Sequence, residues 1–390
     1  MSEEIKNVQE ELNEQMQIRR DKLAEYEADG IYPFGQRFIV KDNAKEIKDD
    51  FFLKYDGQPV VIAGRLMTIR SHGKTAFANV RDKSGDIQVY FRKDVLGEEA
   101  YKYVKMLDIG DIIGVEGHVF KTHTGEVTIK VNKLTLLSKS LRPLPEKWHG
   151  LKDTELRYRQ RYVDLIVNPE VRDTFVKRSQ IVAKIREYMM RDGFMEVETP
   201  MMHAIPGGAA ARPFITHHNA LDIDIYMRIA PELYLKRLIV GGMDRVFEMN
   251  RCFRNEGIDN RHNPEFTTIE SYQAYGDVED AIRLTENLVS YCAQEVLGTQ
   301  EITYQGTEIN LTPPWNRITM AEGVKKYTGE DFDAVTTVEE ARAIADRLNV
   351  EYTDNDGIGK ILNACFEDYV EENLIQPTIV YGHPKEISPL

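Results

Sequence analysis

Residues 245–275 read RVFEMNRCFRNEGIDNRHNPEFTTIESYQAY and contain two runs in which apolar and polar side chains alternate. The runs cover 246–253 and 266–272, and the polar loop between them contains Gly257 and Asn263. Alternation with a period of two is typical of half-buried strands, and glycine and asparagine are typical of turns. The stretch therefore predicts two antiparallel strands joined by a long loop.

The same hairpin concentrates side chains that could hold a ligand, namely Arg254, Glu256, His262 and Phe266. A planar guanidinium can bridge a carboxylate and a phosphate, and an aromatic ring offers a flat face for a nucleobase. On an ordinary hairpin, however, such charges form a solvated tip whose ion pairs contribute little to stability. The residue types alone leave both interpretations open.

Upstream of the hairpin, the pattern predicts a helix followed by a short strand. Apolar residues recur at helical spacing over 175–191, and Gly193 stands where a helix C-cap belongs. Residues 194–199 then alternate as a half-buried strand does, and Pro200 ends the strand. A second helical run is expected over 231–240.

The stretch from 59 to 140 has the pattern of a small β-barrel. We expect strands over 60–70, 75–81 and 86–92, a helix over 95–106, and strands over 111–121 and 126–137. Three strands, a helix and two strands within one small domain is the order of an OB-fold. This fold commonly binds single-stranded nucleic acid, although many OB-folds have other functions.

The N-terminal residues 3–29 predict a long amphipathic helix that ends near Gly30 and Pro33. Such a helix could lie on its own domain or contact nucleic acid. Residues 141–145 contain two prolines and predict a linker.

Bulk properties restrict the class of protein. A chain of 390 residues predicts at least two domains, and no apolar run approaches the length of a membrane span. The net charge of −14 argues against indiscriminate coating of nucleic acid, because such binding depends on a basic surface. The acidic start is unlike a secretory signal, and three cysteines without CxxC spacing favour a reducing compartment and no zinc site. We therefore expect a cytoplasmic protein.

Several stretches together resemble class II aminoacyl-tRNA synthetases, and the bacterial-type lysyl-tRNA synthetases in particular. The hairpin is similar to motif 2 of this class, and GFMEVETPMM at 193–202 is similar to motif 1, which builds the dimer interface. The stretches that resemble lysyl-tRNA synthetases are RYRQRYVDLI at 157–166, PGGAAARPFITHHN at 206–219, RIAPELYLKRLIVGG at 228–242 and RNEGIDNRHNPEFT at 254–267. The resemblance extends from about Arg19 to Leu390.

The resemblance implies an α+β multidomain chain, with an OB-fold barrel and a class II antiparallel sheet flanked by helices. The implied domains are an N-terminal helical extension at 1–58, an OB-fold anticodon-binding domain at 59–140, a linker at 141–155 and a catalytic domain at 156–390. The implied activity is ATP-dependent conversion of L-lysine to lysyl-adenylate, with loss of diphosphate, and transfer to tRNA(Lys). A homodimer using Mg²⁺ with ATP is implied, with Pro200 at the dimer interface.

Site residues follow from matching positions in the motifs. Arg254 is the implied catalytic residue, because it would bridge the lysine carboxylate and the α-phosphate. The implied ATP-binding residues are Arg254, Glu256, His262, Asn263 and Phe266. The implied lysine-binding residues are Gly208, Glu232, Arg254, Glu270 and Tyr272. Without the resemblance, Glu270 would be interpreted as a strand-face carboxylate paired with a neighbouring lysine.

In the OB-like domain, Arg65, Arg70, Phe77 and Gln88 fall on the first three expected strands, and Phe77 and Gln88 match positions that the family uses for the anticodon. We expect these four residues and Glu126 to bind the anticodon. They could supply charge, stacking and base-edge hydrogen bonds to unpaired bases. Small barrels also bury phenylalanine in their core, which is the alternative role for Phe77.

One part of the family pattern has no counterpart. Motif 3, the acidic Mg²⁺ ligands and an acidic partner for the substrate side chain are expected beyond Leu390, so no metal ligand is predicted within these residues. We therefore expect weak or absent activity of this fragment alone. Two other interpretations remain at this point: an aspartyl- or asparaginyl-tRNA synthetase of the same subclass, and a non-catalytic RNA-binding paralogue.

Overall fold

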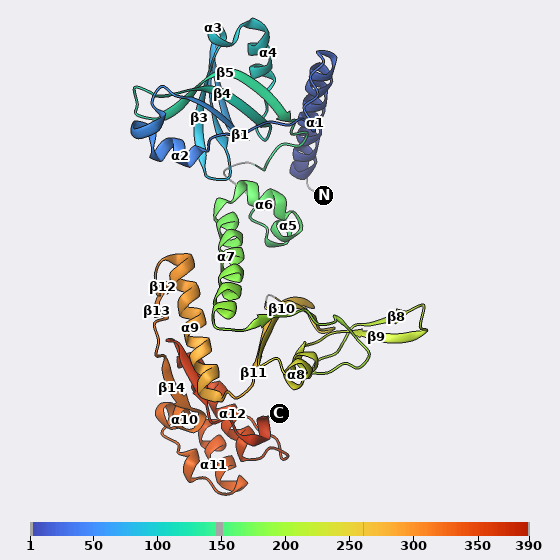
Figure 1. Ribbon diagram of the computed structural model, residues 1–390, viewed down its shortest axis with the longest axis vertical. Coiled ribbons are helices and arrows are strands. Elements are labelled where there is room, and N and C mark those ends of the chain that lie inside the picture. The colour runs from blue at the N-terminus through green and yellow to red at the C-terminus, as the bar shows by residue number, and fades with distance from the viewer. Residues whose placement is uncertain (1–2, 146–150, 260, 389–390) are drawn as a thin grey trace. The chain divides into compact units, whose positions relative to one another are not determined.

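A computed structural model describes residues 3–145, 151–259 and 261–388 of the chain (Figure 1). Residues 146–150 of the predicted linker lie outside the described residues. The chain divides into two compact units, Met1–Arg172 and Asp173–Leu390. No helix in the described part of the chain is both long enough and apolar enough to cross a bilayer.

The first unit contains a closed five-stranded barrel in the order β1-β2-β3-β5-β4. Its strands are β1 (Pro59–His72), β2 (Thr75–Arg81), β3 (Asp86–Arg92), β4 (Ile112–Lys121) and β5 (Val127–Ser138). The pairs are antiparallel except β3 with β5, which is parallel. The predicted OB-fold is thus confirmed.

The helix predicted over 95–106 is instead two helices, α3 (Lys93–Leu96) and α4 (Glu98–Met106). Gly97 separates them with φ +84°, a conformation that side chains other than glycine rarely adopt. The continuous prediction was wrong at this residue, because a left-handed residue cannot continue an α-helix.

Alternate residues of β2 and β3 fill the barrel. Ala76, Ala78 and Val80 of β2 are buried together with Ile87, Val89 and Phe91 of β3. Because side chains of a strand point alternately to opposite faces, the residues between them lie on the outer face.

The helix α1 (Glu3–Ala28) packs against its own barrel through its C-terminal half. Tyr26 is buried, and Arg19 donates hydrogen bonds to three backbone carbonyls, those of Ile109, Ser140 and Arg142. Lys22 pairs with Asp108 at 2.6 Å. Of the two roles considered for this helix, these contacts support the structural one.

A buried ion pair lies below this helix. The side chains of Lys139 and Asp111 are fully buried, with Nζ and Oδ2 2.8 Å apart. Asp111 also accepts hydrogen bonds from the amides of Asp108 and Ser140, and Lys139 pairs with Asp108 at 2.6 Å.

The second unit is built around the predicted hairpin, which is confirmed as β10 (Arg245–Phe253) and β11 (Glu265–Gln273). β6 (Met195–Glu196) adds to β10 in parallel. Helices α7 (Pro169–Arg191), which spans the unit boundary, and α9 (Val278–Leu297) supply apolar residues to the core around Phe247.

The strand predicted over 194–199 contributes only the two residues of β6 to the sheet. The amide of Val197 still donates to the carbonyl of Phe247, but Thr199 turns its hydroxyl to Glu248, and Pro200 has no amide hydrogen. The prediction was therefore too long.

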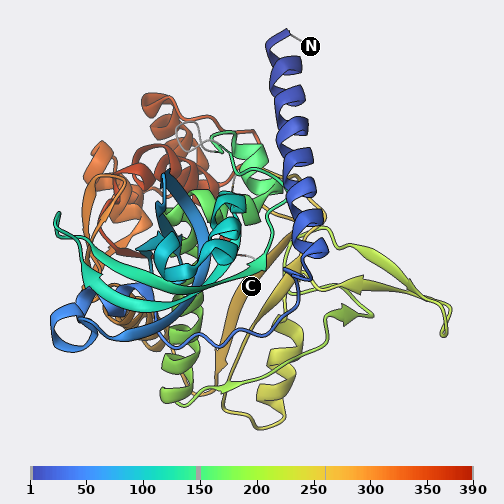
Figure 2. The same ribbon diagram turned by 90° about the horizontal axis from the view of Figure 1, so that it is seen from above.

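Beside the hairpin, β7 (Met202–His203), β9 (Ile223–Met227) and β8 (Ile215–His218) form a small sheet, and α8 (Glu232–Val240) follows it. The β8–β9 hairpin extends away from β10 in both views (Figure 1, Figure 2). A second core is formed by α10 (Met320–Thr328), α11 (Val338–Leu348) and α12 (Ile358–Tyr369). Paired strands nearby are β12 (Glu301–Tyr304) with β13 (Thr307–Asn310), and β14 (Asn316–Thr319) with β15 (Thr378–Tyr381).

Candidate functional site

Arg254 stands directly after β10 and is held by both strands of the hairpin. Its amide donates to the carbonyl of Pro264 at 2.8 Å, and its guanidinium carbon lies 5.1 Å from the centre of the Phe266 ring. The Nε atom is buried and has no hydrogen-bond partner among the described residues. The structure thus brings together a ring and a guanidinium that retains hydrogen-bonding capacity.

The loop after Arg254 is anchored to a second loop. The amide of Asn255 donates to the carbonyl of Arg212 at 2.7 Å, and Glu256 accepts from the amide of Arg212 at 3.3 Å. His262 lies further along, exposed, with Nδ1 2.7 Å from Asp259. Asn263 is also exposed. Glu256 is thus positioned near Arg254, whereas no contact among those of the described residues joins His262 or Asn263 to Arg254.

Two acidic side chains lie beside the hairpin. Tyr272 donates to Glu270 at 3.3 Å, and Glu232, in the first turn of α8, pairs with Lys236 at 2.8 Å. Burial raises the pKa of Glu270 above its ordinary value, and the charge of Glu232 adds to this effect, while the Tyr272 hydroxyl opposes it. No lysine pairs with Glu270 among the described ion pairs, so the alternative role proposed for it is not observed.

Gly208 lies against the start of α8. Its φ is +88°, and a Cβ built on it would come within 2.9 Å of the Glu232 Cβ and 3.2 Å of the Ala230 Cβ. Glycine is therefore required here for two reasons, backbone conformation and close packing. It allows Glu232 to approach the loop at 206–208.

Beneath these groups lies a buried ion pair that the sequence did not reveal. Arg228 donates to Glu248 at 2.6 Å, and each residue is only 1% exposed. Glu248 also accepts from Thr199 at 2.6 Å, and it faces Glu270 across the strand pair. Charged residues are almost never fully buried unless paired, and the place of Glu248 between Phe247 and Met249 is a local hint that its carboxylate needs a partner.

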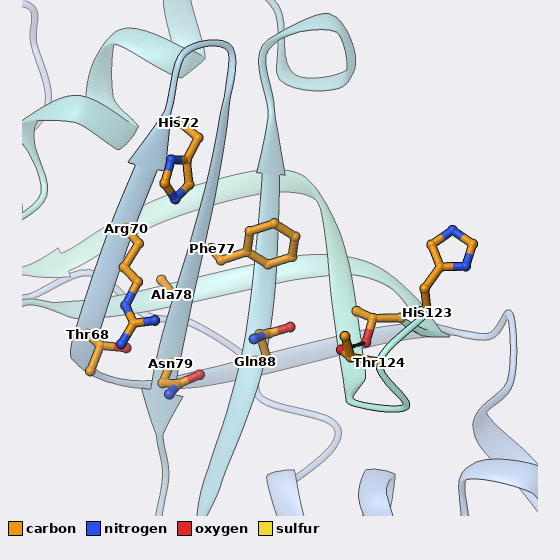
Figure 3. Close-up of a pocket in the computed structure, with 10 residues that line it drawn as sticks. Thr68, Arg70, His72, Phe77, Ala78, Asn79, Gln88, His123 and Thr124 are labelled. Carbon is orange, nitrogen blue, oxygen red and sulfur yellow. Dashed lines mark hydrogen bonds between the residues drawn. The ribbon is translucent and has the colours of Figure 1, made fainter.

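The outer face of the barrel carries a cavity of about 530 Å³ (Figure 3). It is lined by Thr68, Arg70, His72, Phe77, Ala78, Asn79, Gln88, Thr122, His123 and Thr124. Three of the five predicted anticodon residues, Arg70, Phe77 and Gln88, thus meet at one place. Thr68, His72 and Asn79 were missed, although each lies two residues from a predicted one on the same strand face.

Phe77 lies outside the barrel core, stacked on Tyr90 with ring centres 4.3 Å apart. The Oε1 atom of Gln88 accepts from the Thr128 hydroxyl at 2.9 Å. Arg65 and Glu126 do not line the cavity. Arg65 donates to the carbonyl of Gly110 at 2.7 Å, and burial lowers its pKa, while Glu126 lies 3.5 Å from Lys48.

Both parts of the chain match families of known proteins. Residues 60–137 match the family model described as OB-fold nucleic acid binding domain. Residues 153–390, more than half of the chain, match the family model described as tRNA synthetases class II (D, K and N). The chain belongs to the class II tRNA synthetases.

Curated relatives narrow the position of the chain within this family. The lysine–tRNA ligase of Thermoanaerobacter pseudethanolicus is 56% identical over 390 residues, which are 100% of this chain and 78% of the relative. The lysine–tRNA ligase of Carboxydothermus hydrogenoformans is 58% identical over 381 residues, 98% of this chain and 78% of the relative. The lysine–tRNA ligase of Syntrophomonas wolfei is 56% identical over 379 residues, which are 97% of this chain and 77% of the relative. The chain is therefore a member of the lysine–tRNA ligase family.

Two further expectations for this family concern Pro200 and the metal. Pro200 is exposed, and its carbonyl lies 2.9 Å from the Nε2 of His203. In the ranges that the structure describes, no three His, Cys, Asp or Glu side chains are grouped so that they could hold a metal ion.

Proposed function

We propose that this member of the lysine–tRNA ligase family activates L-lysine with ATP and transfers the lysyl group to tRNA(Lys). The observation that carries the proposal is the β10–β11 hairpin. The guanidinium of Arg254 lies over the ring of Phe266, and Glu270 lies on β11, the strand that also carries Phe266. The hairpin thus presents a guanidinium and an aromatic ring, which suit a nucleotide, and next to them a carboxylate, which suits a cationic amino acid.

In the first step, the lysine carboxylate attacks the α-phosphate of ATP and diphosphate leaves. The nucleophile is ionised at neutral pH, so no general base is needed. The site must instead align two anions and offset the charge that develops on the phosphate. Arg254 serves this role, because its Nε is buried without a partner among the described residues.

Phe266 offers a ring for adenine, with Arg254 covering one of its faces. Glu256, one of whose oxygens already accepts from Arg212, accepts from the adenine amino group with the other. His262 and Asn263 lie on the loop that would reach the triphosphate. We propose these four residues and Arg254 as the ATP site.

Lysine carries two ammonium groups, and a buried ammonium requires acidic partners. Glu232 binds the α-ammonium, and Glu270 with Tyr272 lies near the side chain, while Gly208 lets the backbone approach the amino acid. An aspartate pocket would instead need cationic groups. Burial raises the pKa of Glu270, and a cation beside a desolvated carboxylate favours its charged form, which supports this placement of the substrate.

For the second step, tRNA must be recognised by an acidic protein. The barrel cavity offers Phe77 for stacking, Gln88 and Asn79 for base edges, and Arg70 for a phosphate. Arg65 and Glu126 are further proposed contacts to the tRNA, although neither lines the cavity. Local contacts of this kind require no large basic surface.

Some parts of the proposal rest on the family resemblance. We propose Mg²⁺ as the cation that accompanies ATP, a homodimer with Pro200 at the interface, a cytoplasmic location, and domain limits of 59–140 and 156–390. Since the described residues offer no metal cluster, no step is assigned to the metal.

Calorimetric titration of the chain with nonhydrolysable aminoacyl-adenylate analogues tests the proposal. We expect the lysyl analogue to bind, the aspartyl and asparaginyl analogues to bind at least about 100-fold more weakly, and Glu232→Gln to weaken the lysyl analogue. Equal or tighter binding of the aspartyl analogue would overturn the substrate assignment. If the chain binds a tRNA(Lys) anticodon stem-loop but binds none of the three adenylate analogues, a non-catalytic paralogue would be favoured.

A further inference from the structure

Three carboxylates converge beside the hairpin. Glu248 and Glu270 are directly opposite on β10 and β11, and the charge of Glu232 acts on Glu270. Like charges directly opposite on paired strands are destabilising. The proposed function assigns Glu232 and Glu270 to lysine and gives Glu248 no contact with the substrate, so the charge of Glu248 is in excess among the three.

Arg228 accounts for this excess. Its Nη1 donates to Glu248 at 2.6 Å and contacts the Thr199 hydroxyl at 3.3 Å, and its side chain is fully buried. Glu248 also accepts from Thr199 and, at 3.4 Å, from Asn250. These contacts leave Glu248 neutralised and surrounded, whereas Glu270 accepts only from Tyr272 among the described hydrogen bonds.

Arg228 also ties together the segments that carry the site. Its Nε donates to the carbonyl of Arg251 at 2.8 Å, and its own carbonyl accepts from the amide of Phe253 at 2.9 Å. Phe253 directly precedes Arg254, and Arg228 itself lies four residues before Glu232. One buried side chain therefore fixes the end of β10 and the approach to α8.

The pair is not fully satisfied. The Nη2 atom of Arg228 is buried and has no hydrogen-bond partner among the described residues. Burial raises the pKa of Glu270 most, and of the two charges of the pair, Arg228 lowers it while Glu248 raises it. Both charges of the pair therefore act on Glu270, with opposite signs.

We infer that Arg228 is a positioning residue of the amino-acid pocket: it cancels the charge of Glu248, so that Glu270 stays available as a carboxylate beside the substrate side-chain ammonium. This inference rests on the proposed function. Arg228 does not touch the substrate, but acts through Glu248 and the end of β10. The charged and titratable groups around Glu270 are Arg228, Glu232, Lys236, Glu248, Cys252 and Tyr272.

The test compares the lysyl-adenylate analogue with its norleucyl counterpart, which lacks the side-chain ammonium. The ratio of their Kd values, the ammonium selectivity, is measured by calorimetry as a function of pH, upward from the ordinary pKa of Glu270, because burial raises that pKa. The variants are Arg228→Met, Glu248→Gln, the double variant, and Arg228→Lys, which keeps the charge. Circular dichroism checks that each is folded.

In Arg228→Met, Glu248 and Glu270 must share a proton, as two neighbouring carboxylates do. We expect the ammonium selectivity near neutral pH to fall about tenfold, and its pH midpoint to rise by about one unit. Glu248→Gln leaves an unpaired guanidinium that repels the ammonium and also lowers the selectivity. In the double variant both buried charges are gone, so neither Glu248 nor Arg228 acts on Glu270 or on the ammonium. The ammonium selectivity of the double variant should therefore return to within about threefold of wild type. Arg228→Lys should retain most of the selectivity.

An unchanged selectivity and pH midpoint in Arg228→Met would overturn the inference. Failure of the double variant to recover selectivity would also overturn it, because the role would then be packing. If Arg228→Met does not fold, Glu248→Gln and the double variant decide the question. A wild-type chain that binds neither analogue would count against the proposed function and not against the role of Arg228.

Discussion

The guanidinium of Arg254 lies 5.1 Å from the centre of the Phe266 ring, although the two residues are separated by the whole loop of the hairpin. The contact is fixed by the strand register, which pairs Cys252 with Phe266 and Phe253 with Glu265. A cation–π contact of this kind places the guanidinium over one face of the ring and contributes about 0.5–2 kcal/mol. Arg254 and Phe266 are therefore already in contact without a ligand.

Arg254→Ala should weaken binding of the lysyl-adenylate analogue by about 100-fold, because truncating one partner of a desolvated charge pair costs about 2–5 kcal/mol. Calorimetry measures the loss. The matched control is Arg251→Ala, since Arg251 is exposed and pairs only at the surface with Glu265 at 3.3 Å. Equal losses in both variants would contradict the assignment of Arg254.

Phe77→Ala should weaken binding of a tRNA(Lys) anticodon stem-loop by about 5- to 150-fold, because stacking of one base contributes about 1–3 kcal/mol. Fluorescence anisotropy with a labelled stem-loop checks this prediction. Phe52→Ala is the control, because Phe52 is 78% exposed on the same unit and does not line the cavity. An unchanged Kd for the Phe77 variant would remove it from the anticodon site.

The pH dependence of lysine recognition follows from Glu270, whose ordinary pKa of 4.5 is raised chiefly by burial. Only the ionised form attracts the ammonium, so analogue binding should begin to weaken above pH 4.5 as pH falls. The effect on stability has the opposite sign: a folded-state pKa above the unfolded one means that protonation favours folding. In Glu270→Gln, binding of the lysyl analogue should not change with pH over this range. Glu265→Gln is the control: Glu265 lies on the exposed part of β11, so this variant should keep the pH dependence of the wild type.

Lys139→Met should lower the free energy of unfolding of the barrel unit by about 3–5 kcal/mol, because it leaves the buried Asp111 carboxylate without its cation. Urea denaturation followed by circular dichroism measures this change. Lys133→Met is the control, since Lys133 makes an exposed pair with Glu116 at 2.8 Å. A loss below about 1 kcal/mol, the range of surface pairs, would show that the pair is poorly coupled to folding.

Acid stability of the same unit should depend on Asp108. Burial alone would raise the pKa of Asp108, but hydrogen bonds from Lys139 and Lys22 outweigh burial and lower it below 3.8. A lowered folded-state pKa contributes stability above the unfolded value, and this stability is lost as pH falls through the folded value. Asp108→Asn should remove this pH-dependent part below about pH 4, where Asp titrates when unfolded. Parallel acid titrations of the two proteins test the prediction.

The sequence predicted the barrel well because its signals are local. The bounds of β2 and β3 were predicted to the residue, since each is an alternating run between turn residues. The break at Gly97 could also have been predicted, because an isolated glycine in a helical pattern is a known warning. The shortened strand β6 could not, because its length depends on the contact of Thr199 with Glu248, a residue far along the chain.

The site was predicted in part for the same reason. Arg70, Phe77 and Gln88 lie on strands whose facing residues follow from alternation, and the same rule would have added His72 and Asn79. The contribution of Thr124 depends on how the β4–β5 loop folds back. The pair of Arg228 with Glu248 joins two elements that no periodicity relates, so only the tertiary structure reveals it.

The alternating burial of β2 and β3 has a consequence for how recognition by the barrel can change. Apart from Ala78, which belongs to both sets, the residues that fill the interior and the residues that face the cavity occupy separate positions on these strands. Phe77, Asn79 and Gln88 can therefore be exchanged without opening a void in the interior. A randomised library at these three positions should keep a near-constant melting temperature while its members diverge in the trinucleotides they prefer, so this face can evolve independently of the scaffold beneath it.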